Sequence, residues 1–195
     1  MDTDTVTLFF ALLATLAQAL VAVAVVLAVG GRFVPAVARV GAAVRAQVGP
    51  QALALAAVVA LVCTLGSLYL SDGGHWFSNA PEFPPCKLCW YQRIAMYPQV
   101  VVLAIAALRR DRGVRVTGIV LSAIGGAVSI YHLLVERYPS LSTSTSCDPT
   151  NPCGIKWVER FGYLTIPGMA LSGFALIVVL LAVADPPARR PRETP

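Results

Sequence analysis

The sequence predicts an all-α integral membrane protein with five transmembrane helices, and three observations indicate this fold class. Hydrophobic residues make up 57% of the 195 residues and charged residues only 13%, against roughly 25% charged in an ordinary soluble domain. Five continuously apolar runs have the length of about 20 residues that a helix needs to cross the hydrocarbon core; they cover residues 6–30, 51–70, 90–108, 116–135 and 164–184. Strands of membrane β-barrels would instead alternate in hydrophobicity over roughly ten residues.

The first apolar run is expected to be a retained helix and not a cleaved signal peptide. It follows an acidic start, Met1-Asp2-Thr3-Asp4-Thr5, and it is longer than the apolar region of a usual signal peptide. We therefore count it among the membrane spans.

The loops between the runs differ in basic residues, and this difference predicts the orientation because Lys and Arg stay preferentially in the cytoplasm. Ten basic residues lie at one end of the helices: Arg32, Arg39, Arg45, Arg109, Arg110, Arg112, Arg115, Arg189, Arg190 and Arg192. Five lie at the other end: Lys87, Arg93, Arg137, Lys156 and Arg160. We expect the N-terminus and the loops 71–89 and 136–163 outside, and the C-terminus inside. The basic residues form short clusters without a basic face, so no nucleic-acid partner is expected.

A first cysteine pair lies in the outer loops, in the sequence Pro84-Pro85-Cys86-Lys87-Leu88-Cys89. The prolines keep the chain extended before a helix begins, which puts Cys86 near the cap and Cys89 in the first turn. The helix start and Lys87 favour a thiolate, so at least one of these thiols is expected to have a depressed pKa. A reactive dithiol is the favoured interpretation; a static disulfide, or half of a zinc site, is the alternative.

A second pair, Cys147 and Cys153, follows a Ser/Thr-rich stretch and encloses Asp-Pro and Asn-Pro turn sequences. This composition predicts a mobile, exposed loop. Closing so short a ring stabilises a fold little, because the entropy gain grows with loop length. A relay disulfide therefore explains the pair better than a loop-tightening one, which remains the alternative.

Two polar residues lie in the apolar runs near the outer boundary. Arg93 is close to the start of the third run, where it either extends to the interface or serves a ligand. His132 is near the outer end of the fourth run, and a lone interfacial histidine is more often a satisfied surface group than a functional one. Cys63, inside the second run, is interpreted as a small apolar filler.

Several linked motifs resemble one family, the DsbB/BdbC disulfide bond formation proteins. The family signature is resembled by Pro85-Cys86-Lys87-Leu88-Cys89-Trp90-Tyr91-Gln92-Arg93-Ile94-Ala95-Met96-Tyr97-Pro98, and the end of its third core helix by Tyr131-His132 with Tyr138-Pro139-Ser140. Its second redox loop and last helix are resembled by Cys147 to Cys153, Trp157, Gly162 and Thr165-Ile166-Pro167. The resemblance covers about residues 51–184.

The resemblance implies that the chain re-oxidises a thioredoxin-fold dithiol oxidase, DsbA-like or BdbD-like, outside the bacterial cytoplasmic membrane and passes the electrons to a membrane quinone, ubiquinone or menaquinone. It implies that Cys147 forms the mixed disulfide with the partner and that Cys153 completes that pair. Cys86 and Cys89 would re-oxidise it, with the Cys89 thiolate facing the quinone ring.

The same resemblance places Arg93 at the quinone and His132 near it, and it implies no metal. It divides the chain into an extra N-terminal helix with a cytoplasmic loop (1–50), a four-helix redox core (51–184) and a cytoplasmic tail (185–195). The extra helix departs from the family core, whose two ends both lie inside. Only five residues separate the cysteines of the second pair, so a regulatory membrane-lying helix found in some members is not expected.

Two other functions remain open. A membrane metal-binding or transport protein could use the four outer cysteines as ligands, although their spacing is uneven and the spans lack the acidic residues common in ion pathways. An enzyme like vitamin K epoxide reductase also joins outer cysteines to a quinone, but there the quinone-side Cys-x-x-Cys lies in a late helix, whereas here it starts an early core helix.

The orientation can be tested with topology reporters. A reporter fused at Asp111 should show cytoplasmic activity, because basic residues retain the loop around it in the cytoplasm. A reporter fused at Asn79 should show activity only outside. A cytoplasmic signal from Asn79 would contradict the predicted orientation.

Overall fold

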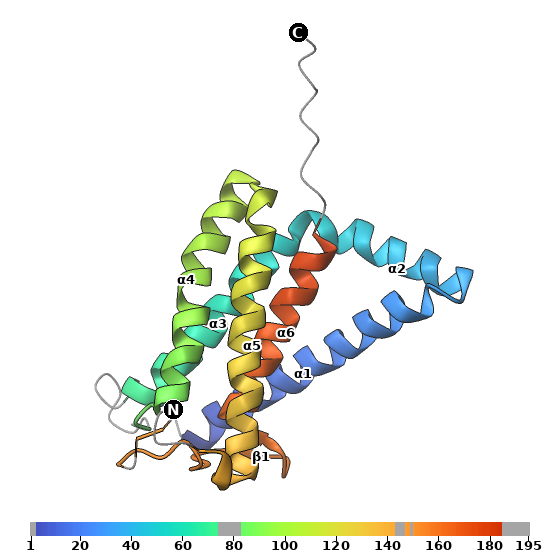
Figure 1. Ribbon diagram of the computed structural model, residues 1–195. Coiled ribbons are helices and arrows are strands. Elements are labelled where there is room, and N and C mark those ends of the chain that lie inside the picture. The colour runs from blue at the N-terminus through green and yellow to red at the C-terminus, as the bar shows by residue number, and fades with distance from the viewer. Residues whose placement is uncertain (1–2, 74–82, 143–146, 149, 185–195) are drawn as a thin grey trace.

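The chain folds into long helices. Some of them run side by side, and others are steeply inclined to these (Figure 1). The computed structural model describes residues 3–73, 83–142, 147–148 and 150–184. Its elements are α1 (Thr3–Gly30), α2 (Pro35–Val48), η1 (Gly49–Gln51), α3 (Ala52–Asp72), α4 (Lys87–Arg109), η3 (Arg112–Val114), α5 (Arg115–Arg137), η4 (Pro139–Leu141), β1 (Glu159–Arg160), β2 (Leu164–Thr165) and α6 (Ile166–Val183). Five helical stretches are long and apolar enough to cross a membrane: α1, the continuous Pro35–Asp72, α4, α5 and α6. The predicted all-α membrane fold is confirmed.

Helices α3, α4, α5 and α6 form a bundle, and small residues let its members approach closely. Gly125 of α5 faces the ring of Phe174 of α6: a Cβ atom at Gly125 would lie 2.2 Å from Cζ of that ring. Phe174 is 1% exposed and lies at the centre of the apolar core. The glycine therefore provides the space that the largest buried side chain fills.

Polar side chains are paired between α4 and α5 and at the end of α6, as the apolar surroundings favour. Gln99 of α4 is fully buried; its amide donates to the carbonyl of Ala95, and its Oε1 accepts from the Ser122 hydroxyl of α5 at 2.9 Å. At the C-terminal end of α6, Arg45 donates to the carbonyl of Ala182 and Arg115 to that of Leu181, each at 2.8 Å. Cations at a helix C-terminus complement its dipole, so these arginines also fix the end of α6.

The starts of α1 and α4 and the β1–β2 hairpin lie at one end of the molecule, and the last turn of α6 lies at the other (Figure 1). In the hairpin Glu159 pairs with Thr165, and the turn uses the positive φ angles of Phe161 and Gly162. The start of α1 therefore shares an end with the first cysteine pair, which lies at the start of α4, as expected. Which side of the membrane that end faces stays a prediction.

The structure differs from the sequence-based expectations in two places. Residues 35–48, expected in a loop, form α2, which Pro35 begins and in which no residue is buried. Residues 164–165, expected to begin the last helix, are strand β2, and α6 begins at Ile166. The predicted tail, 185–195, and part of the Ser/Thr-rich stretch, 143–146, lie outside the described residues.

Two adjacent glycines give a matched test of the bundle. Gly125→Ala should lower the thermal midpoint in detergent, because overpacking of this kind costs about 1–3 kcal/mol. Gly126→Ala should leave it nearly unchanged, since the nearest side-chain atom to its new Cβ would be 3.7 Å away. Circular dichroism gives the thermal midpoints. Equal midpoints for the two variants would show that α5 and α6 are not packed in this way.

Candidate active site

The first cysteine pair lies at the start of α4, after the extended Pro84 and Pro85. Cys86 is the N-cap residue, and its Sγ accepts a hydrogen bond from the backbone N–H of Cys89 at 3.3 Å. The two Sγ atoms are 2.9 Å apart. The predicted position of the pair, with Cys86 at the cap and Cys89 in the first turn, is confirmed.

His132 of α5 lies beside this pair and is 3% exposed. The Gln92 amide donates to its Nδ1 at 3.2 Å, which leaves the proton of a neutral imidazole on Nε2. Nε2 lies 3.0 Å from the carbonyl oxygen of Cys153, to which it donates, and 3.7 Å from Sγ of Cys86. His132 is therefore not the exposed interfacial residue that its position suggests; one nitrogen faces both cysteine pairs.

The surroundings of Cys86 lower the pKa of its thiol below the ordinary value. The hydrogen bond from the Cys89 thiol has the largest effect, burial opposes it, and the hydrogen bond from His132 adds to the lowering. The backbone N–H of Cys89 contributes least. The sequence predicts a depressed pKa from the helix start and Lys87, whereas the neighbouring side chains are the main cause in the structure.

The second pair forms a disulfide between Cys147 and Cys153, whose Cα atoms are 5.7 Å apart. Cys147 is 7% exposed and Cys153 is 1% exposed, and both lie in one buried cluster with Cys86 and Val135. The prediction of an exposed position is therefore wrong for these two cysteines. Composition indicated a loop correctly, but it carries no information about the surface on which the loop lies.

Polar contacts hold the second loop against the first. Asp148 Oδ1 accepts from the backbone N–H and the hydroxyl of Thr150, at 2.8 and 2.7 Å, and these bonds lower the pKa of Asp148. Asn151 donates from its side-chain amide to the carbonyl of Pro85 at 3.2 Å. The turn inside the disulfide ring is thus tied to the residue before Cys86.

Arg93 of α4 is 8% exposed and is held by α3. Its Nε donates to Oγ of Ser67 at 3.1 Å, and its Nη2 donates to the Ser67 carbonyl at 3.2 Å. Tyr97 donates to the same Oγ at 3.2 Å, and the guanidinium lies 5.1 Å from the centre of the Trp90 ring. The cation is therefore held inside the protein by α3 and two aromatic rings of its own helix.

A cavity of about 340 Å³ opens beside Cys89 and Arg93, between α1, α3, α4 and α6. Most of its lining side chains are apolar. Two of its lining residues, Phe83 and Trp157, stack with ring centres 5.4 Å apart. His132 does not line this cavity; it lines a smaller one with Cys86, Glu136 and Cys153, and Cys89 lines both.

Two residues of this site, Gln92 and Ser67, were not predicted from the sequence. Gln92 follows Cys89 by three positions and precedes Met96 by four, so helical spacing alone places these residues on one face with Arg93. The position of Gln92 beside the cysteines could therefore have been predicted from this spacing. Ser67, the partner of Arg93, carries no such signal, because it is one small residue in an apolar run.

The predicted alternative of a four-cysteine metal site does not match the geometry of the described residues. Cys147 and Cys153 are joined to each other. The ligand atoms of Cys86, Cys89 and His132 lie within 4.8 Å of one another, so this trio is the set that could hold a metal ion.

Comparison with known proteins gives the family. The family model described as disulfide bond formation protein DsbB matches residues 52–184. Disulfide bond formation protein C of Bacillus subtilis (strain 168) is 40% identical over 126 residues, which cover 65% of this chain and 86% of that protein. The probable disulfide formation protein of Coxiella burnetii (strain CbuK_Q154) is 39% identical over 129 residues, 65% of this chain and 82% of that protein. No solved structure matches the chain significantly. The chain belongs to the DsbB family and is a disulfide-forming oxidoreductase of the membrane.

Proposed function

We propose that this protein re-oxidises a thioredoxin-fold dithiol oxidase, DsbA-like or BdbD-like, on the outer face of the bacterial cytoplasmic membrane and delivers the electrons to a membrane quinone. One observation carries the proposal: the two cysteine pairs lie in one cluster, and one cysteine of the first pair, Cys89, also lines an apolar cavity among the spanning helices. Such an arrangement connects a soluble dithiol with a lipid-soluble electron acceptor.

The first exchange takes place at the Cys147–Cys153 disulfide. A thiolate of the partner attacks Sγ of Cys147, which forms a mixed disulfide and releases Cys153 as the leaving thiolate. The second partner thiol then attacks the mixed disulfide and releases Cys147, so the partner leaves as a disulfide and this pair holds two thiols. Cys147 is the more exposed of the two, which supports it as the sulfur that is attacked.

The second exchange re-forms the disulfide of the second pair, Cys147 and Cys153. Cys153 attacks Cys86 of an oxidised Cys86–Cys89 pair and releases Cys89, and Cys147 then displaces Cys86. The common buried cluster of Cys86, Cys147 and Cys153 supports this order. The Nε2–H of His132 faces Cys86 and the Cys153 carbonyl, so it can stabilise negative charge on sulfur during the exchange.

The cavity fits a quinone by its chemistry. A quinone has a flat ring with two oxygen acceptors and a long apolar chain, and the cavity combines an apolar lining with the donors Arg93 and Gln92 near Cys89. A bound quinone would take up two electrons and two protons and leave as the quinol. Arg93, held by Ser67, stabilises negative charge at this end of the cavity. The stacked Phe83 and Trp157 restrict water at the outer end.

A metal-binding function is the alternative. Its ligands would be Cys86, Cys89 and His132, not four cysteines. Elemental analysis of the purified, reduced protein distinguishes the two. One zinc ion per chain, bound tightly enough to prevent oxidation of the partner, would support the alternative; redox turnover of metal-free protein would support the oxidase.

The relay is tested with purified protein, a quinone and the reduced partner. A reduced partner whose second cysteine is replaced by alanine should accumulate a mixed disulfide with Cys147 of the wild-type protein, because no second partner thiol releases it, whereas Cys147→Ser should accumulate none. Cys89→Ser should reduce partner oxidation to below about 1% of wild type, since no other sulfur closes the relay. Non-reducing electrophoresis and mass spectrometry identify the adducts. Oxidation of the partner at the wild-type rate by both Cys89→Ser and Cys147→Ser would contradict the mechanism.

The low pKa of Cys86 predicts a pH dependence of the reduced protein. An ordinary thiol, with a pKa of about 8.5, is mostly protonated at pH 7, whereas Cys86 should remain a thiolate there because its pKa is lowered. Cys89→Ala removes the largest cause and should move the titration to higher pH. Thiolate ultraviolet absorbance, with Cys86→Ser as the blank, gives the curve. An unshifted titration in Cys89→Ala would exclude the hydrogen bond as the cause.

A further inference from the structure

Helix α1 precedes the residues that the family model matches, yet it is built into the molecule. Ala11 and Ala14 are buried against Leu164, which lies two residues before the start of α6. A Cβ atom at Gly66 of α3 would lie 2.6 Å from Cε1 of Phe10, so the phenyl ring occupies the space over that glycine. The helix is therefore packed against both α3 and α6 near the outer end.

One face of α1 forms a wall of the cavity that contains Cys89 and Arg93. Its lining residues include Phe10, Leu13, Ala17 and Leu20. These positions recur at intervals of three and four, so they lie on one side of the helix. Phe9 and Leu12, on another side, are each 54% exposed and do not line the cavity. The cavity beside the redox pair is thus bounded in part by a helix outside the family core.

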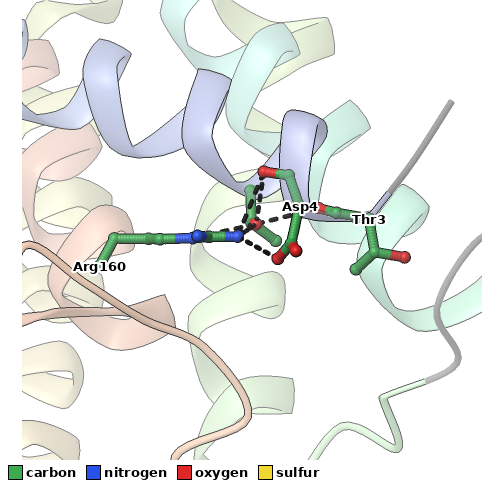
Figure 2. Close-up of polar contacts among 4 residues, drawn as sticks. Thr3, Asp4 and Arg160 are labelled. Atoms are coloured by element: carbon green, nitrogen blue, oxygen red, sulfur yellow. Dashed lines mark hydrogen bonds and ion pairs between the residues drawn. The ribbon is translucent and has the colours of Figure 1, made fainter.

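Polar contacts fix α1 at two levels. At its start, Arg160 of β1 donates from Nη2 to Oδ1 of Asp4 at 2.5 Å and from Nε to Oγ1 of Thr7 at 3.2 Å (Figure 2). Three turns further along, the Gln18 amide donates to Oγ of Ser172 in α6 at 3.0 Å, and its Oε1 accepts from the Tyr163 hydroxyl at 2.9 Å. These bonds determine which face of α1 is turned toward the cavity.

The cavity is longer than a quinone ring. Its α3 lining extends from Val58 to Ser71, which corresponds to about 20 Å along a helix. The polar groups lie near Cys89 and Arg93 at the outer end, whereas Val58, Leu20 and Leu176 at the other end are apolar. This distribution matches an amphiphile with a polar head at the redox pair and an apolar chain directed into the membrane.

The geometry points to α1 as the wall that binds the isoprenoid chain of the quinone. Phe10, Leu13, Ala17 and Leu20 contact the chain while the ring lies near Cys89, and the contacts of Asp4, Thr7 and Gln18 hold that wall in place. This inference rests on the proposed quinone function and assigns to α1 the recognition of the apolar chain.

Binding measurements on the purified full-length protein test this assignment. The probes are a long-chain menaquinone and a chainless naphthoquinone with the same ring, titrated against intrinsic tryptophan fluorescence in detergent. The double variant Phe10→Ala/Leu13→Ala should raise the Kd of the long-chain quinone about tenfold through lost apolar contact, and that of the chainless compound less than twofold. The matched control, Phe9→Ala/Leu12→Ala, should change neither Kd by as much as twofold.

A second measurement does not depend on affinity. A photoreactive benzophenone side chain replaces Leu13 in one variant and Leu12 in another, and each is irradiated in native membranes. Mass spectrometry should find a quinone adduct at position 13 and none at position 12. An adduct of phospholipid alone at position 13 would overturn the inference.

The outcomes separate this inference from the proposed function. If wild-type protein binds neither quinone, the proposed function itself fails. If wild type binds the long-chain quinone and Phe10→Ala/Leu13→Ala binds it equally well with an unchanged thermal midpoint, the role of α1 is refuted while the proposed function stands.

Discussion

A polar side chain inside a membrane must find its hydrogen-bond partner within the protein, and this constraint determines how the helices of the bundle meet. The bond between Gln99 and Ser122 joins α4 to α5. The bond between Gln92 and His132 repeats the connection closer to the cysteines. Because both pairs must be satisfied at once, α4 and α5 have little freedom to slide or rotate. The position of His132 beside Cys86 follows from this fixed register.

The start of α4 gives its two cysteines different surroundings. Cys86 has extended backbone geometry and lies in the buried cluster with Cys147 and Cys153, whereas Cys89 is already helical and lines the large cavity. A helix beginning one residue earlier or later would turn both sulfurs away from these neighbours, since each residue rotates the side-chain direction by about 100°. The prolines before Cys86 thus contribute to function by setting where the helix begins.

The sequence predicts the spans well because each is a property of one continuous segment. The Cys86–Cys89 helix start is predictable for the same reason: its prolines, cysteines and apolar continuation are adjacent. The burial of Cys147 and Cys153 is not, because it depends on Asn151 bonding to the chain before Cys86, a contact between distant segments. Helix α2 was not predicted because Arg39, Arg45 and Gln47 interrupt its apolar residues, so it lacks the long apolar run by which the spans were found.

The role of α1 was also hidden from the sequence, since an apolar helix in a membrane looks the same whether it faces lipid or a cavity. Its attachments explain how a cavity can persist beside it. A void lined by apolar groups forfeits their dispersion contacts, so helices held by apolar packing alone tend to close it. Here Arg160 and Ser172 hold α1 through polar bonds at two levels. Such directional bonds fix the position of the helix without requiring its cavity face to touch α3 throughout. The cavity beside Cys89 can therefore stay open, and a membrane molecule that entered it would restore the contacts that an empty void forfeits.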